Sequence, residues 1–173
     1  MEVAGLMTSA GAGEMSRNQE EAEMKMIEKI VVPIDFAENT DKLVAYACAM
    51  AEKFAAAIHF LHVVAAYPGD VMIGAPFAEE YRDRIIFAAE ERMKNLVDDC
   101  NARGRVCTGL VVGGEPVEKI VELAAAAGAD IIVISTHGAK GLEKILLGSV
   151  AERVLKRAHC PVLIMNPFKK LKA

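Results

Sequence analysis

Two glycine-containing segments near the C-terminus have the residue types of an anion-binding site. Residues 135–138 read Ser-Thr-His-Gly, and after nine intervening residues Gly148, Ser149 and Val150 begin an expected helix. A glycine lets the backbone approach a ligand closely, and the first turn of a helix presents N–H groups at the positive end of the helix dipole. Phosphate suits that geometry. The alternative is that Gly138 and Gly148 only permit turns.

One aspartate and three histidines lie in these segments or on or beside the expected strands. Asp35 follows an apolar run at 30–34, where an Asp can either cap the next turn or contact a ligand. His137 could act as a general base or acid near neutral pH, or could be a loop histidine bonded to backbone. His59 and His62 are three residues apart on one strand, so they point to opposite faces and cannot pair at a metal.

Composition limits the classes of function. The chain has 173 residues, 53% apolar and 25% charged, with a net charge of -4, which indicates one globular domain of ordinary size. It has no long Lys/Arg block, so we expect no nucleic-acid partner. No apolar run approaches the roughly 18 to 20 residues that span a bilayer, so we expect no membrane association and a cytoplasmic protein. No His/Asp/Glu cluster has metal-ligand spacing, and Mg²⁺ would arrive only with phosphates.

The order of the expected elements predicts an α/β fold. Short apolar strands alternate with helices, and the run at 30–34 has no polar alternation, as expected of a strand covered on both faces. The strands are expected at 30–34, 58–64, 106–112, 129–135 and 161–165, and the helices at 40–52, 78–103, 116–127 and 148–156.

Right-handed crossovers then predict three layers, with a five-stranded parallel sheet in the order 3-2-1-4-5 and helices on both faces. We expect helices one and four on the same face. Ligands of such sheets bind at the carboxyl ends of the strands where the winding reverses, here between strands one and four. That rule places Asp35 beside residues 135–138.

Several motifs resemble the universal stress protein family. Ser-Thr-His-Gly, nine residues, Gly-Ser-Val-Ala-Glu-Arg-Val-Leu and then His-Cys-Pro-Val-Leu-Ile are similar to the C-terminal signature of that family. Residues 30–36, Ile-Val-Val-Pro-Ile-Asp-Phe, resemble its opening strand, and residues 61–63, Leu-His-Val, resemble its second. The resemblance covers about residues 26–167, nearly all of the expected globular part.

The resemblance implies a site for ATP or AMP. In the nucleotide-binding branch the pattern is Gly-x-x-Gly, nine residues, then Gly followed by Ser or Thr; Ser135 replaces the first glycine here, which puts the affinity in question. The Ser149 hydroxyl and the Val150 N–H would donate to phosphate, Asp35 would hold the ribose hydroxyls, and Pro33 and Val63 would border the adenine. The full set of expected binding residues is Pro33, Asp35, Val63, Ser135, His137, Gly138, Gly148, Ser149 and Val150.

Three functions remain open at this point. The first is a regulatory, stress-response module that binds ATP or AMP. The second is slow ATP hydrolysis, with His137 or Asp35 orienting water, although the chain lacks a Walker-type loop and a Gly-x-Gly-x-x-Gly fingerprint. The third is a nucleotide-free dimeric interaction module, in which Ser135 and the apolar segment 71–73 serve a protein partner or close the pocket.

The remaining segments bear on assembly and on the thiols. The strand at 161–165 is apolar and lies at a sheet edge, so we expect a homodimer formed through it. Residues 1–25 are expected to be a flexible extension of the domain at 26–168, followed by a basic tail at 169–173. The four cysteines show no Cys-x-x-Cys spacing and are expected to be reduced, packed thiols; Cys100 and Cys107 lie on neighbouring elements and could meet.

Overall fold

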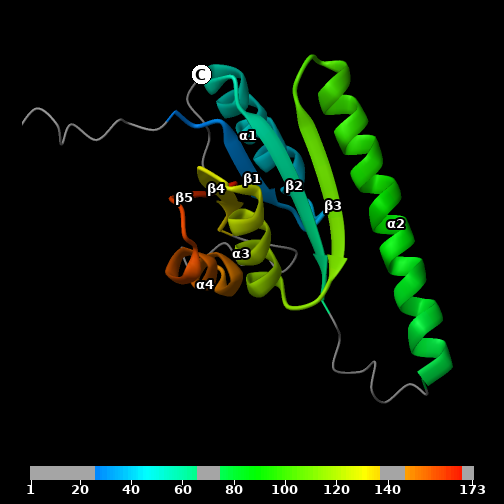
Figure 1. Cartoon of the computed structure of the whole chain (residues 1–173). Coiled ribbons are helices and arrows are strands. Elements are labelled where there is room, and N and C mark those ends of the chain that lie inside the picture. The colour runs from blue at the N-terminus through cyan, green and yellow to red at the C-terminus, as the bar shows by residue number, and fades with distance from the viewer. Residues whose placement is uncertain (1–25, 66–74, 137–146, 169–173) are drawn as a thin grey trace, which may run out of the picture.

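The structure is a computed structural model that describes residues 26–65, 75–136 and 147–168. Its five strands are β1 (Lys29–Pro33), β2 (Ala57–Val64), β3 (Cys107–Gly113), β4 (Ile131–Ser135) and β5 (Val162–Met165). All neighbouring strands pair in parallel, in the order β3-β2-β1-β4-β5 (Figure 1). The expected sheet and strand order are therefore confirmed.

The helices divide between the two faces of the sheet. They are α1 (Thr40–Phe54), α2 (Ala75–Ala102), α3 (Pro116–Ala127) and α4 (Ser149–Arg157). The buried residues of α1 and α2 belong to one apolar cluster, and those of α3 and α4 to a second cluster on the opposite face. The expectation that helices one and four share a face is wrong. The first two crossovers run toward β3 and the last two run toward β5, so right-handed connections put α1 with α2 and α3 with α4.

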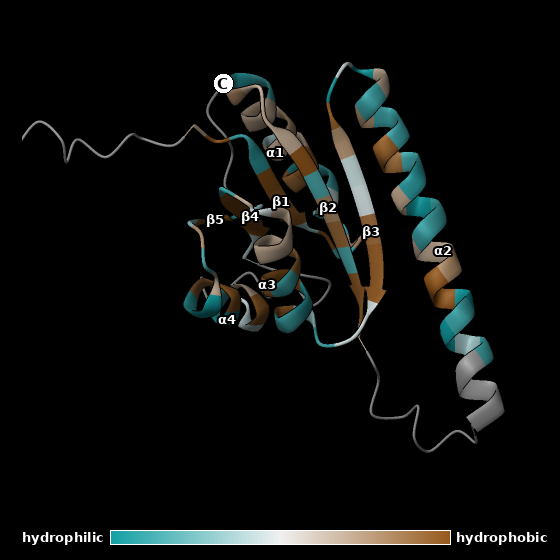
Figure 2. Cartoon of the chain, in the orientation of Figure 1, coloured by the Kyte–Doolittle hydropathy of each residue, from teal (hydrophilic) through white to brown (hydrophobic). Residues whose placement is uncertain are grey.

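The central strand is covered on both sides. Ile30, Val31 and Val32 are completely buried, and their side chains alternate between the two clusters. Figure 2 shows β1 and β4 mostly in brown, whereas β2 alternates between brown and teal and much of the α2 ribbon is teal. Burial on both faces explains the absence of polar alternation in the sequence of this strand.

Local signals set several helix and strand ends. Pro116 is the first residue of α3, the Glu115 side chain accepts a hydrogen bond of 2.8 Å from the Glu118 N–H, and Gly128 ends the helix with φ of 60°. At the start of the next strand, Asp130 Oδ2 accepts hydrogen bonds of 2.9 and 3.0 Å from the N–H groups of Glu28 and Lys29. This carboxylate therefore ties the beginning of β1 to the beginning of β4.

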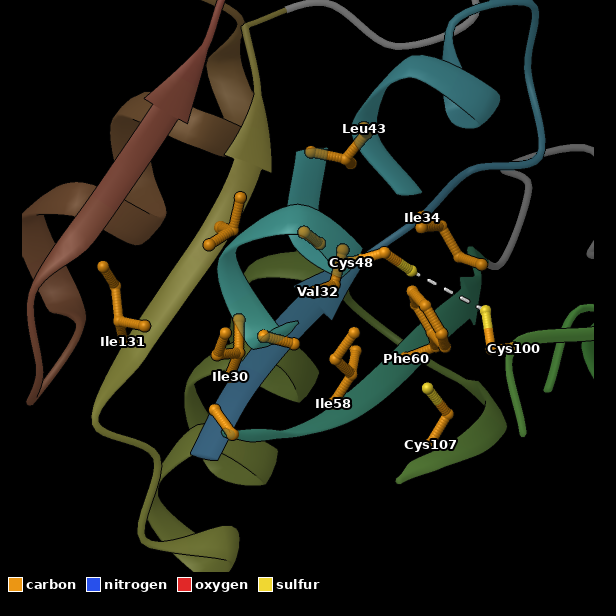
Figure 3. Close-up of a cluster of buried hydrophobic side chains, with 14 of the residues drawn as sticks. Ile30, Val32, Ile34, Leu43, Cys48, Ile58, Phe60, Cys100, Cys107 and Ile131 are labelled. Atoms are coloured by element: carbon orange, nitrogen blue, oxygen red, sulfur yellow. Dashed lines mark hydrogen bonds between the residues drawn. The ribbon is translucent and has the colours of Figure 1, made fainter. Parts of the chain in front are cut away.

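The thiols lie in and beside the core. All four cysteines are free, and Cys48, Cys100 and Cys107 are buried in the cluster between the sheet and helices α1 and α2. The sulfur atoms of Cys48 and Cys100 are 3.9 Å apart, and Cys107 lies in the same cluster (Figure 3). The expectation of reduced, packed thiols agrees with this arrangement, and Cys100 interacts with both Cys48 and Cys107.

Candidate functional site

The start of α4 is joined to the end of β4. The N–H of Gly148 donates a hydrogen bond of 2.8 Å to the carbonyl of Thr136, and the N–H of Thr136 donates one of 2.9 Å to the carbonyl of Met165 in β5. Helix α4 is held in place by Ala151 and Val154, which are buried against the sheet. The two segments that the sequence singled out therefore do converge, as far as they are described.

The position of Gly148 allows no side chain. A Cβ atom there would overlap with the carbonyl oxygen of Thr136 and would lie 3.4 Å from its carbonyl carbon. Gly148 has an extended backbone with φ of -61° and ψ of 145°, so the constraint is steric and does not come from a left-handed conformation. Glycine is needed here because the backbone of the helix start approaches the backbone of the strand end.

The first turn of α4 carries the N–H groups expected to bind an anion. Gly148 is the residue before the helix and has no side chain with which to cap these groups. Ser149 follows it and is exposed, whereas Val150 is half-buried and packs against the α3/α4 cluster. A helix start of this kind presents donors and a positive dipole end toward the carboxyl edge of the sheet.

An ion pair connects α4 to α3 next to this helix start. Arg153 Nη1 donates to Glu115 Oε1 at 2.9 Å, and the other carboxylate oxygen caps the first turn of α3. Partial burial raises the pKa of Glu115, but the hydrogen bond from Glu118 N–H and the Arg153 guanidinium outweigh it and lower that pKa overall. Arg153 therefore links α4 to the first turn of α3.

Asp35 lies just past β1, and its side chain caps the turn that leads into α1. Its Oδ1 accepts hydrogen bonds of 3.0 Å from the Ala37 N–H and 3.2 Å from the Thr40 hydroxyl. The side chain is exposed, and among the residues that the structure describes Oδ2 has no hydrogen-bond partner. Both interpretations of Asp35 are thus compatible with one conformation: one oxygen caps the turn and the other faces outward.

The residue after Asp35 has an unusual backbone. Phe36 has φ of 55°, in the left-handed region that costs a non-glycine residue roughly 1–2 kcal/mol. The Arg92 guanidinium of α2 donates a hydrogen bond of 2.8 Å to the Phe36 carbonyl and lies 4.5 Å from the centre of its ring. The His62 ring lies 4.9 Å from the same ring, and His62 Nδ1 is 2.9 Å from the Ile34 carbonyl. Sequence analysis did not find this group, because no local signal marks a contact across 56 residues.

The two expected adenine neighbours share a face of the sheet. Pro33 ends β1 opposite Leu61, and Val63 lies two residues further along β2. Both are half-buried, and strand alternation puts them on the face that also carries α4. Ser135 ends β4 in the next strand and is half-buried, but strand alternation puts its side chain on the opposite face, together with that of Val133. His137 and Gly138 lie outside the described residues.

Within residues 26–65, 75–136 and 147–168, no group of three or more His, Cys, Asp or Glu side chains could hold a metal ion. None of the described helices combines the length and the apolar character needed to cross a bilayer.

Comparison with known proteins identifies the family. Residues 26–166 match the model of the universal stress protein family. Universal stress protein MJ0531 of Methanocaldococcus jannaschii is 34% identical over 148 residues, which cover 84% of this chain and 85% of that protein. The solved structure of MJ0577, from the same organism, is 30% identical, covers 86% of this chain and all of that one, and superposes with a TM-score of 0.73.

One similar structure contains a nucleotide. A universal stress protein crystallised in complex with cAMP is 25% identical to this chain, with a TM-score of 0.58 and coverage of 83% of this chain and 99% of that one. The family model matches residues 26–166, and the sheet of this chain superposes on that of a solved structure of similar sequence. The chain belongs to the universal stress protein family.

Proposed function

We propose that this protein is a stress-response module that binds an adenine nucleotide, ATP or AMP, at the carboxyl ends of β1 and β4. The observation that carries the proposal is the contact between Gly148 and the Thr136 carbonyl, which brings the donor end of α4 to the edge of the sheet. The similar protein that was crystallised with cAMP supports the same class of ligand.

We assign each expected binding residue a role, and His137 and Gly138, which lie outside the described residues, keep the role that the sequence suggested. The Ser149 hydroxyl and the Val150 N–H donate to the phosphates, with Ser135, His137 and Gly138 completing that part of the site. The outward Oδ2 of Asp35 accepts from a ribose hydroxyl, because Oδ1 already caps the turn. Pro33 and Val63 form the apolar border of the base. Mg²⁺ would be bound through the phosphates.

Substitution of Asp35 by asparagine is expected to weaken ATP binding by about tenfold, which corresponds to about 1.4 kcal/mol. Asparagine keeps an oxygen for the Ala37 N–H and so preserves the turn, but it replaces the second carboxylate oxygen with an amide that cannot accept. The measurement is calorimetric titration of the full chain with ATP and with AMP.

The direction in which Asp35→Asn changes the affinity for ATP distinguishes ribose binding from capping of the turn alone. Glu38→Gln is a matched control, because Glu38 is also exposed and lies three residues away. Loss of a negative charge near a polyphosphate should strengthen binding slightly, so a carboxylate that only caps the turn would give equal or tighter binding in Asp35→Asn. No binding of ATP or AMP to the wild type at millimolar ligand would remove the proposed function.

We also propose that the module is a homodimer through β5. This strand pairs with β4 on one side and forms the edge of the sheet on the other, and Val162, Leu163 and Ile164 are only half-buried in one chain. Pairing of two β5 strands across a two-fold axis would satisfy the open backbone groups and cover these side chains.

Light scattering is expected to give twice the 18.6 kDa of one chain at micromolar concentration. Leu163→Lys should shift the mass toward one chain, because it places a charge in the proposed interface. Leu110→Lys is the control, since Leu110 lies on the opposite edge strand, β3, and is already 44% exposed. A wild-type monomer, or equal effects of the two substitutions, would argue against pairing through β5.

A further inference from the structure

The turn that carries Asp35 is held by contacts from distant parts of the chain. Phe36 follows Asp35 directly and has φ of 55°, although no glycine, asparagine or aspartate stands at that position. A bulky residue in the left-handed region persists only where its surroundings enforce that conformation. The contacts of Phe36 must therefore be strong enough to hold it there.

Two side chains make these contacts. Arg92 donates to the Phe36 carbonyl at 2.8 Å, and the same guanidinium lies 4.5 Å from the centre of the Phe36 ring. His62 packs against that ring at 4.9 Å and bonds through Nδ1 to the carbonyl of Ile34, two residues earlier. Arg92 and His62 thus fix the backbone on both sides of Asp35.

The conformation of Phe36 decides where Asp35 can point. The Ala37 N–H that bonds Asp35 Oδ1 at 3.0 Å belongs to the peptide immediately after Phe36. If φ of Phe36 changed sign, this N–H would turn away, and the carboxylate would lose the bond that leaves Oδ2 outward. The direction of the Asp35 carboxylate is thus coupled to a side chain of α2.

We infer that Arg92 is a positioning residue for ribose recognition: it holds Phe36 in the left-handed conformation and thereby aims Asp35 Oδ2 at a ribose hydroxyl. This inference rests on the proposed function and adds a specificity to it, namely preference for nucleotides that carry ribose hydroxyls. Arg92 itself contacts the turn and not the ligand.

The test compares ATP with 2′,3′-dideoxyATP, which lacks both hydroxyls. Calorimetric titration of the wild type should show that ATP binds about tenfold more tightly than dideoxyATP, which is the effect of one hydrogen bond to a charged acceptor. In Arg92→Ala that ratio should fall to about two, because ATP affinity drops while dideoxyATP affinity hardly changes. Lys94→Ala is the control, since it removes a cation of the same helix that pairs with Asp98, and its ratio should stay at the wild-type value.

A second background distinguishes positioning from general attraction of phosphate. Glycine adopts positive φ without strain, so Phe36→Gly needs the arginine less. Arg92→Ala should therefore lower the ratio of ATP affinity to dideoxyATP affinity less when it is combined with Phe36→Gly than when it is made in the wild type. Equal losses for both ligands in both backgrounds would mean that Arg92 acts only through its charge, and the inference would be wrong.

A measurement without nucleotide separates this inference from the proposed function. The NOE between the amide proton and Hα within Phe36 is strong at positive φ, and it should weaken in Arg92→Ala but not in Lys94→Ala. An unchanged NOE in Arg92→Ala overturns the inference, whether or not ATP binds. If the NOE weakens as expected but the wild type binds no ATP, the proposed function and the ribose role fail together, while the effect of Arg92 on the turn stands.

Discussion

Gly148→Ala is expected to bind ATP about 30- to 100-fold more weakly than the wild type, which corresponds to about 2 to 3 kcal/mol. The added methyl group would overlap with the Thr136 carbonyl oxygen, so the start of α4 must move away from the end of β4. The donors of the helix then no longer lie where the phosphate is bound. The same movement breaks the 2.8 Å hydrogen bond between Gly148 and Thr136.

Gly113→Ala provides the control for this substitution. Gly113 ends β3, also at the carboxyl edge of the sheet, but among the described residues a Cβ there would meet only the Val64 carbonyl oxygen at 3.9 Å, an ordinary contact. The affinity of the Gly113→Ala variant for ATP should equal that of the wild type. Urea denaturation should show a loss of stability of about 1 to 3 kcal/mol in Gly148→Ala alone. Wild-type affinity in Gly148→Ala would mean that this glycine plays no part in nucleotide binding.

Alkaline pH is expected to destabilise the protein through its buried thiols. Burial, assisted by the neighbouring Cys100 thiol, raises the pKa of Cys48 from 9.0 to about 11, and burial also raises the pKa values of Cys100 and Cys107. In the unfolded chain Cys48 loses its proton near pH 9, whereas in the folded chain it keeps it. The unfolded state is therefore favoured as the pH rises from about 9, and the contribution of this thiol to stability is lost by about pH 11.

The size of this effect follows from the shift. A change of about two pKa units in one group corresponds to about 2 to 3 kcal/mol in the free energy of unfolding. Urea denaturation of the wild type and of Cys48→Ala, with reductant present, should give a constant difference up to about pH 8.5. Toward pH 11 the difference in the free energy of unfolding between the two proteins should change by about 2 to 3 kcal/mol, because the wild type loses stability faster than Cys48→Ala. Parallel profiles over the whole range would show that Cys48 titrates normally.

Much of the architecture could be predicted because the decisive signals are local. The uninterrupted apolar run of β1, Pro116 at the start of α3 and Gly128 at its end each depend on a few neighbouring residues, and the structure has all three in the expected places. The grouping of the helices was wrong although the strand order was right. It depends on the direction of each crossover, which has to be followed strand by strand.

The candidate site divides in the same way. Gly148 and Asp35 could be found in the sequence because a glycine before a helix and an aspartate after a strand have recognisable local contexts. That Asp35 uses one oxygen for capping was an open alternative until the turn was described. Cys48 and Cys100 were not expected as a pair, because they are 52 residues apart and lie on different helices.

The sequence by itself determined the fold class, the strand order and the family, and it placed Asp35 and Gly148 at the carboxyl edge of the sheet, since these depend on periodicity, turn residues and motif spacing. Only the tertiary structure decided that Gly148 has no room for a side chain, that Phe36 is held in a left-handed conformation and that Arg92 holds it there. The physical reason is that steric overlap and backbone strain depend on distances between atoms far apart in the chain, and packing of α2 and α4 against the sheet sets those distances.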